Sequence, residues 1–382
     1  MNSSQTSYSQ VESSTVQTVI SHVTGGGNKS CTFTPQIQRI EYIDALRGFT
    51  MILVVMWHIS LYCLQSTHMI SYNSIMAQFR MPLFFFVSGF VFYKDTIWKK
   101  FTLITFIKKK IAVQIITPTL FLALYIYIHK HPIMGLFFND HRYGYWFTYV
   151  LFLYYLFYIC ITFTSQFIGI KSIGHDIMLF IGGGVCYIVF FVWKYLIEKD
   201  IANLLLIIHW RYFIYFVLGI IAKKHFAYFR QLLDNRYVFL FIIIFYFLYN
   251  FFDKYILEFH RIIYVVLFNI RDFCGVLIVF TFFRKYSSAF TKEKWIGRSL
   301  QYIGQRTLDI YLLHYFFLPW GLASAFTFFA DNKLPSLEIF ASLFISLLVI
   351  SLCLIISNVY RLSPWIEQNM FGVKKKKESE KG

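Results

Sequence analysis

The sequence has few charged residues for its length. Only 14% of its 382 residues are Asp, Glu, Lys or Arg, whereas a soluble domain carries roughly 25%. A soluble protein of this size needs a polar shell, so burial in a core does not explain the shortage. The apolar residues, 58% of the chain, stand in long blocks, and a helix needs about 20 largely apolar residues to cross a bilayer. These features exclude an ordinary soluble domain and indicate a membrane protein.

Several other patterns are also missing. Apolar and polar residues do not alternate with period two, so a β-barrel is not predicted. The six cysteines show neither disulfide nor metal-ligand spacing, and we predict no metal site. A basic segment followed by an apolar core and a cleavage site is absent, so no signal peptide is predicted. The 36 Lys and Arg exceed the 19 Asp and Glu, but they cluster in alternate loops, which indicates a bilayer rather than nucleic acid as the partner.

The apolar blocks predict an all-α, polytopic bundle of about ten transmembrane helices, because backbone polar groups must be satisfied internally in lipid. The predicted spans are 47–65, 81–97, 110–129, 144–166, 177–197, 202–222, 237–253, 262–283, 307–329 and 336–358. Residues 1–38, rich in Ser, Thr and Gln, are predicted to form a disordered cytoplasmic tail. Residues 39–370 form the membrane domain, and 371–382 a basic cytoplasmic tail.

The distribution of basic residues sets the orientation. With the N-terminus inside and ten spans, 26 Lys and Arg lie on the cytoplasmic side and 8 on the outer side. Cytoplasmic loops are the ones enriched in Lys and Arg. Both termini are therefore predicted to be cytoplasmic, and an odd number of spans would put the basic C-terminal tail outside.

Arg47 and His58 form the main candidate site. They are eleven residues apart, close to three helical turns, so both face one way with an offset of about 16 Å. We expect Arg47 at the inner surface, His58 near mid-membrane, and both on the wall of one pocket. An arginine can hold a phosphate with a bidentate fork, and a neutral imidazole is a good general base. On spacing alone, a structural histidine bonded to a carbonyl and an ordinary inner-side arginine are the simpler interpretation.

Five segments resemble the acyltransferase 3 family. Ile40–Gly48, continuing to Trp57 and His58, resembles its first helix, in which an Arg is followed by ten residues and a His. Four later segments resemble its other signatures in the same order: Met81–Phe90, Tyr145–Phe152, Tyr212–Gly219 and Ile303–His314. Together they cover residues 40 to about 370.

The resemblance implies a function. Members O-acylate glycans, lipids or small molecules, with an acyl-CoA donor in the cytoplasm and an acceptor often outside. The chain would then be an acyltransferase of the bacterial cytoplasmic (inner) membrane. It would move an acyl group, most commonly acetyl, from acyl-CoA to a hydroxyl of a cell-surface glycan or lipid-linked glycan. His58 would be the general base or a transient acyl carrier, and Arg47 its essential partner.

The donor site departs from the family pattern. Many members carry Arg-x-x-Arg at the inner end of the third helix, to help hold CoA, and that pair is missing here. Lys108, Lys109 and Lys110 stand in this region, followed by Gln114. The lysines are expected either to attract CoA phosphates as point charges or to anchor the helix at the inner surface.

Four further residues are candidates for the acceptor site, because titratable groups inside a membrane are costly. Arg80 either touches the acceptor or anchors the second helix at the interface. Arg271 and Asp272 either form a structural pair or bind substrate, and we expect each to pair with other helices because neighbours point about 100° apart. His314 either contacts the acceptor or packs.

Two other classes of function remain. A transporter or flippase for a lipid-linked sugar or small solute is the leading alternative, although paired halves with matching helix breaks are not apparent in the sequence. A non-catalytic scaffold would leave Arg47, His58, Arg271 and Asp272 without a role. The sequence identifies neither the acceptor nor the oligomeric state.

Overall fold

The structure is a computed structural model that describes residues 40–64, 71–93, 100–259, 261–320, 335–364 and 370–371. These residues all belong to one compact unit, Ile40–Gly382. The predicted disordered tail, residues 1–38, and nearly all of the predicted basic tail, 371–382, lie outside the described residues.

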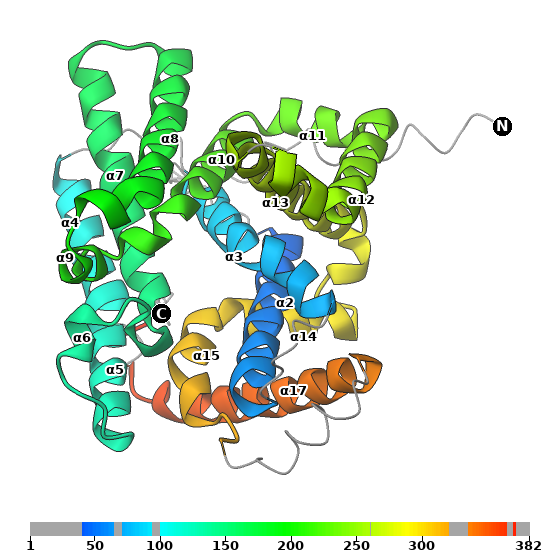
Figure 1. The fold of residues 1–382 in the computed structure, drawn as a ribbon. Helices are drawn as coiled ribbons and strands as arrows, with labels where there is room; N and C mark the ends of the chain where they lie inside the picture. The colour runs from blue at the N-terminus through cyan, green and yellow to red at the C-terminus, as the bar shows by residue number, and fades with distance from the viewer. Residues whose placement is uncertain are drawn as a thin grey trace, which may run out of the picture. The chain divides into compact units, whose positions relative to one another are not determined.

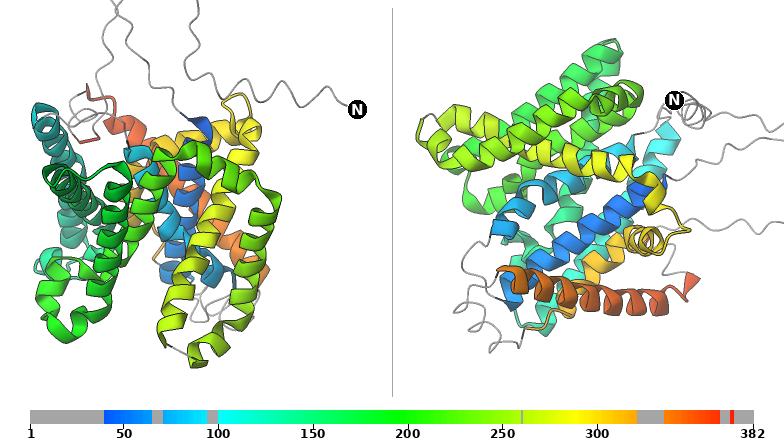
Figure 2. Two further views of the ribbon diagram at one scale, coloured as in Figure 1. Left: turned by 90° about the horizontal axis from the view of Figure 1, so that it is seen from above. Right: turned by 90° about the vertical axis from the view of Figure 1, so that its right-hand side faces the viewer.

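Helices make up the described part of the chain, in which no strand occurs. In order they are α2 (Glu41–His58), η1 (Ile59–Cys63), α3 (Ser71–Phe92), α4 (Lys100–Ile111), η2 (Ala112–Ile116), α5 (Thr117–Ile128), α6 (Gly135–Phe138), η3 (Arg142–Gly144), α7 (Trp146–Phe167), α8 (Ser172–Leu196), α9 (Lys199–Leu204), η4 (Ile207–Tyr212), α10 (Phe213–Lys224), α11 (Phe226–Asp234), α12 (Arg236–Phe259), α13 (Arg261–Lys285), η5 (Ser287–Phe290), α14 (Trp295–Gln305), α15 (Thr307–Leu313), η6 (His314–Phe316) and α17 (Pro335–Tyr360). Within the unit, α2 and α3 lie between the α4–α9 segment and the α11–α13 segment (Figure 1; Figure 2).

Seven helices among the described residues are long and apolar enough to cross a membrane. They are Glu41–Cys63, Ile75–Phe92, Leu103–Ile128, Trp146–Phe167, Ser172–Trp193, Ile263–Lys285 and Ser336–Tyr360. An eighth is added if α11 and α12, bent by 76°, form one span. The multi-pass helical prediction is confirmed; the count of ten and the cytoplasmic termini stay predictions.

Two of the ten predicted spans are not single helices in the described residues. The block 202–222 is divided among α9, the 3₁₀ helix η4 and the short α10. The break lies at Leu206, whose φ of 54° is left-handed and interrupts an α-helix. Of the block 307–329, the described part contains only α15 and η6, and residues 321–329 lie outside it.

Close helix packing holds α2 and α3 in place. A Cβ on Gly48 of α2 would overlap the carbonyl of Leu300, and one on Gly304 of α14 would overlap that of Asp44. Gly89 of α3 and Gly219 of α10 are related in the same way. Small residues let membrane helices approach to backbone contact, so these two glycine pairs fix the helices that carry the candidate site.

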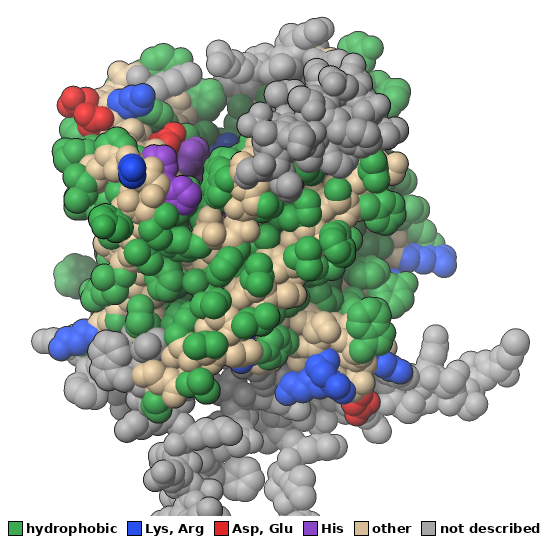
Figure 3. Space-filling view, turned by 90° about the horizontal axis from the view of Figure 1, so that it is seen from below, with side chains coloured by type: hydrophobic (Ala, Val, Ile, Leu, Met, Phe, Trp, Pro, Cys, Tyr) green, Lys and Arg blue, Asp and Glu red, His purple; other side chains and the backbone are tan. Residues whose placement is uncertain are grey.

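The surface around the helix bundle carries the apolar side chains expected of a protein in lipid. Figure 3 shows a broad band of hydrophobic side chains, with Lys and Arg along one edge and histidines with charges of both signs at the opposite edge. Phe241 and Phe340, for example, are 68% and 69% exposed. A band with so few charged side chains suits contact with acyl chains.

Candidate active site

His58 lies at a change of helical geometry. It is the last residue of α2, and the π-helix η1 follows at once. Single π turns inside α-helices often occur at functional sites. Here the wider turn stacks the ring of Tyr62 on that of His58, with centroids 5.9 Å apart and an angle of 5°. The helix path therefore presents the imidazole edge toward η6 rather than burying it in the turn.

A chain of hydrogen bonds fixes the tautomer of His58. The Nδ1 of His314 lies 2.9 Å from the carbonyl of Ile310, which can only accept, so this nitrogen carries the proton. The Nε2 of neutral His314 then accepts from Nδ1 of His58, 3.3 Å away. The remaining nitrogen of His58, Nε2, is left with its lone pair and accepts from the hydroxyl of Tyr315 at 2.9 Å. The basic nitrogen of His58 is thus Nε2.

A tight loop positions Tyr315. Gly144 has φ 98°, and a Cβ there would overlap the ring of Tyr315. The carbonyl of Gly144 accepts from the hydroxyl of Tyr311 at 3.1 Å. The hydroxyl of Tyr145 donates to the carbonyl of Leu312 at 2.8 Å. The loop therefore accepts one hydrogen bond from α15 and donates another to it, which docks the loop against α15 and η6. Position 144 requires glycine, because any other residue would be strained at this φ and would overlap Tyr315.

His58 and Tyr315 line a cavity of about 460 Å³, which we call the histidine chamber. Its polar and charged lining residues are His58, Tyr62, Arg80, His141, His209, Arg211, Tyr212, Tyr311 and Tyr315. Aromatic and aliphatic side chains such as Trp57, Phe84, Trp146 and Phe147 make up much of the rest. A mostly apolar cavity with a few converging polar groups is typical of a ligand site.

Arg47 faces the same neighbour as His58 but does not line the histidine chamber. Its Nη2 donates to Oγ1 of Thr307 at 3.0 Å, at the start of α15, whereas His58 contacts His314 just beyond its end. Both residues therefore lie on one face of α2, as the spacing predicts. The expectation that both line one pocket is wrong for the described cavity, because three turns of helix separate them.

The residues of α4 and η2 that are candidates for binding acyl-CoA are also absent from the described lining of the histidine chamber. Lys108 and Lys109 are exposed. Lys110 lies over the ring of Tyr155 of α7, with Nζ 4.6 Å from its centroid. Gln114 is 5% exposed, and its Oε1 has no hydrogen-bond partner among the described residues.

Arg80 lines the histidine chamber. It is 8% exposed, and its guanidinium carbon lies 4.4 Å from the ring centroid of Trp57. His314, in contrast, is fully buried and is absent from the chamber's described lining. The structure thus places Arg80 where a ligand can reach it and His314 behind His58.

Arg271 and Asp272 pair with each other, which corrects our expectation. Nε and Nη2 of Arg271 donate to Oδ1 of Asp272 at 3.1 and 2.7 Å. Neighbouring Cα–Cβ bonds diverge, but the long arginine side chain reaches back across the helix surface to its neighbour. The pair lines a second cavity of about 320 Å³, the aspartate chamber, which shares Arg211 and Tyr212 with the histidine chamber.

Sequence reasoning did not find Tyr315 or the residues that hold it. The only signal was position, since Tyr315 directly follows His314 at the end of the last family-like segment. Arg211 lines both chambers, although it is not among the main candidates that the sequence offers. Its membership of both chambers depends on the break before η4, which the apolar pattern conceals.

Fold and site together define a multi-pass membrane protein in which a histidine of fixed tautomer borders a buried, aromatic-lined cavity. The family model described as an acyltransferase domain matches residues 40–357. The chain therefore belongs to the acyltransferase 3 family, and it is a membrane acyltransferase. No curated protein and no solved structure matches it.

Proposed function

We propose that this acyltransferase moves an acyl group, usually acetyl, from cytoplasmic acyl-CoA to a hydroxyl of a cell-surface glycan or lipid-linked glycan. The observation that carries the proposal is the lone pair of His58 Nε2 at the wall of the histidine chamber. A base must be within hydrogen-bond reach of the proton it takes. An acceptor hydroxyl that replaces the hydroxyl of Tyr315 at Nε2 meets that condition, and it leaves Tyr315 free to donate elsewhere.

The reaction balances with His58 as a single proton carrier. The acceptor hydroxyl gives its proton to Nε2 while its oxygen bonds to the thioester carbonyl carbon. The C–S bond then breaks, and the CoA thiolate takes the proton back from His58. Tyr315, whose hydroxyl lies 2.9 Å from Nε2, is placed to donate to the oxyanion that forms between these steps.

The histidine pair supports this role electrostatically. When His58 gains a proton, its Nδ1–H remains directed at the acceptor nitrogen of His314. His314 in turn is held by the carbonyl of Ile310. This arrangement orients the imidazole in the way that the third member of a catalytic triad orients its histidine.

The donor enters from the end of the bundle where α2 begins, which we propose is cytoplasmic. The side chain of Arg47 is 31% exposed, and its guanidinium can bind a phosphate of CoA. Lys108, Lys109, Lys110 and Gln114 are proposed to add phosphate attraction and hydrogen bonding on the donor side. The extended pantetheine arm of CoA then spans the offset along α2, about 16 Å between Arg47 and His58.

The test is acylation by variants of the full chain in membranes. His58→Ala removes the base and is expected to lower the O-acyl content of surface glycans by at least about 10²-fold. His175→Ala is the matched control, because His175 bonds to Thr162 on the α7–α8 hairpin and lies outside the described linings of both chambers. Undiminished acylation by a folded His58→Ala protein would remove the proposal.

The same variants separate direct transfer from an acyl-histidine intermediate. Incubation with radiolabelled acetyl-CoA in the absence of acceptor labels the protein at His58 if the acyl group passes through the imidazole. No label on the wild type, together with loss of transfer in His58→Ala, indicates general base catalysis.

A further inference from the structure

The histidine chamber carries positive charge without a balancing carboxylate. Arg80 and Arg211 both line it, and neither Asp nor Glu is among its lining residues in the described part of the chain. Transferring an ion out of water costs several kcal/mol unless a counter-charge or hydrogen bonds replace the water. One buried and one partly buried guanidinium in the same cavity therefore call for an anion that enters with a ligand.

Arg80 is the better buried of the two. Its Nε and Nη1 are shielded from solvent and have no hydrogen-bond partner among the described residues. The ring of Trp57, 4.4 Å from the guanidinium carbon, supports one face of the group. A cation over a ring face spends no N–H donor on that contact, so its donors remain for an oxyanion.

Arg211 completes the arrangement from the 3₁₀ helix η4. Its Nη2 donates to the hydroxyl of Tyr212 at 2.7 Å, and its guanidinium carbon lies 5.3 Å from the ring centroid of Phe190. Its Nε is buried without a hydrogen-bond partner among the described residues. Like Arg80, Arg211 is held by aromatic rings and retains an unsatisfied donor.

The nearest carboxylate in the cavity system does not cancel this charge. Asp272 lines the adjoining aspartate chamber, where Arg271 donates two hydrogen bonds to it. Across the two chambers three guanidiniums face one carboxylate, which leaves two positive charges in excess. Asp272 also interacts electrostatically with Arg211, so the positive charge is least compensated at Arg80, near which no carboxylate is found among the described residues.

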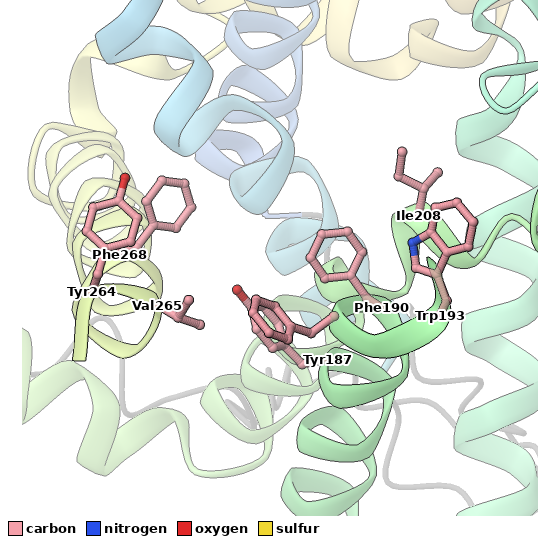
Figure 4. A pocket seen from close by; sticks show the side chains of 8 residues that line it. Tyr187, Phe190, Trp193, Ile208, Tyr264, Val265 and Phe268 are labelled. Carbon is pink, nitrogen blue, oxygen red and sulfur yellow. The ribbon is translucent and has the colours of Figure 1, made fainter. Parts of the chain in front are cut away.

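An aromatic groove adjoins the histidine chamber. This third cavity, about 350 Å³, lies between α8 and α13 and shares Phe190 and Ile208 with the histidine chamber. Figure 4 shows Tyr187, Phe190 and Trp193 on one side of it, with Tyr264 and Phe268 on the other. Flat aromatic faces suit the apolar face of a sugar ring next to a bound anion.

We propose that the acceptor is anionic, and that Arg80 and Arg211 together bind its carboxylate or phosphate so that a neighbouring hydroxyl meets Nε2 of His58. This proposal rests on the proposed function, because it names the substrate class of the same site. The anion is either the carboxylate of an acidic sugar or the phosphate of a phosphorylated or lipid-linked sugar. Both present oxyanions that a guanidinium binds through charge-assisted hydrogen bonds.

Equilibrium binding to the purified full-length protein in nanodiscs tests the proposal without requiring transfer. Four probes of similar size are compared: glucuronate, glucose 1-phosphate, glucose and glucosamine. We expect at least one anionic probe to bind at least about tenfold more tightly than glucose, which is neutral, and glucosamine, which is cationic. The reason is that a hydrogen bond to a charged group contributes about 1.5–3 kcal/mol. Preference for glucuronate assigns an acidic sugar, and preference for glucose 1-phosphate assigns a sugar phosphate.

The variants assign that preference to the two arginines. Arg80→Gln and Arg211→Gln are each expected to raise the Kd of the preferred anionic probe about tenfold, with glucose unaffected. Arg236→Gln removes an equal charge from an exposed site at the start of α12 and should leave the Kd unchanged. If Arg80→Gln fails to fold, two other variants still decide: Arg211→Gln, and Arg80→Lys, which keeps the charge but loses the bidentate guanidinium and should also weaken binding of the anionic probe.

Three results would overturn the proposal: equal binding of charged and neutral probes, an unchanged Kd in folded Arg80 and Arg211 variants, or displacement of the anionic probe by coenzyme A. The last would assign the arginines to the donor. His58→Ala keeps these outcomes apart from the proposed function, because it should bind the anionic probe as the wild type does while losing transfer.

Discussion

At the scale of single residues, the orientation of His58 depends on a neighbour, His314, that lies outside the described linings of the three cavities. His314 is buried and accepts the Nδ1 proton of His58. Without this acceptor, nothing in the hydrogen-bond chain favours the tautomer of His58 that has its proton on Nδ1 and its lone pair on Nε2. His314 is therefore a positioning residue in our interpretation, rather than the acceptor-binding residue that its position in the sequence allowed.

Replacing His314 separates these two roles. His314→Phe is expected to lower kcat about 10²–10⁴-fold, the contribution of a positioned general base, with little change in the acceptor KM. The measurement is steady-state transfer from acetyl-CoA by protein in nanodiscs. A raised acceptor KM at unchanged kcat would instead place His314 in contact with the acceptor.

Gly144 gives a second residue-scale prediction, with an internal control. Gly144→Ala forces an L-residue to φ 98° and brings its Cβ into the ring of Tyr315. Strained backbone alone costs about 1–3 kcal/mol. Gly169→Ala imposes a similar strain at φ 77°, but nothing lies within 4 Å of its Cβ.

We therefore expect Gly144→Ala to lower the thermal midpoint further than Gly169→Ala, and to lower transfer as well. Thermal unfolding and activity of the two detergent-purified variants give the comparison. Equal effects of the two substitutions would mean that contact with Tyr315 contributes nothing.

At the scale of elements, the two glycine pairs predict which helices cannot move apart. Gly304→Ala places a Cβ against the carbonyl of Asp44 at the α2–α14 contact, and overpacking typically costs about 1–3 kcal/mol. Gly184→Ala in α8 meets open space and should be neutral or stabilising by up to about 1 kcal/mol through helix propensity. The recovery of monodisperse protein after stepwise heating compares them. A Gly304→Ala protein as heat-resistant as Gly184→Ala would contradict backbone contact between α2 and α14.

The sequence predicted elements better than it predicted contacts between them. Arg47 and His58 lie on one face of α2 because helical periodicity is a local property. The pairing of Arg271 with Asp272 was missed because side-chain length, not the direction of Cβ, decided it. The bonds of His58 to His314 and Tyr315 join residues more than 250 positions apart, and no local pattern contains that information.

The break at Leu206 shows why the site was harder to predict than the fold. An apolar block from 202 to 222 has the composition of one span, yet the chain turns there and directs Arg211 into both chambers. Hydropathy averages over such a turn. Left-handed backbone at leucine has no sequence signal, because leucine ordinarily avoids that conformation.

At the scale of the whole chain, the proposed chemistry requires a defined orientation in the membrane. Arg47, which we propose binds the donor, lies toward the start of α2, whereas the histidine chamber lies toward the end of α2 and borders the η3–α7 loop. The transfer we propose works across the bilayer only if the first end is cytoplasmic. The excess of basic residues on that side predicts this orientation, independently of the site.

Single cysteines at two exposed positions test the orientation directly. Asp200 in α9 lies in an outer loop of the predicted topology, and Lys292, just before α14, lies in an inner one; both are exposed. In intact cells, a membrane-impermeant maleimide should label Asp200→Cys above the wild-type background. Lys292→Cys should react only after the membrane is permeabilised, because the bilayer then no longer separates it from the reagent.

The opposite labelling pattern would invert the protein and place the His58 end of the bundle in the cytoplasm. Donor and acceptor would then have to enter from exchanged sides, and the arginines of the histidine chamber would face the CoA pool. Labelling of both positions in intact cells would mean that the chain between α9 and α14 crosses the membrane an even number of times, which contradicts the predicted span count in that segment.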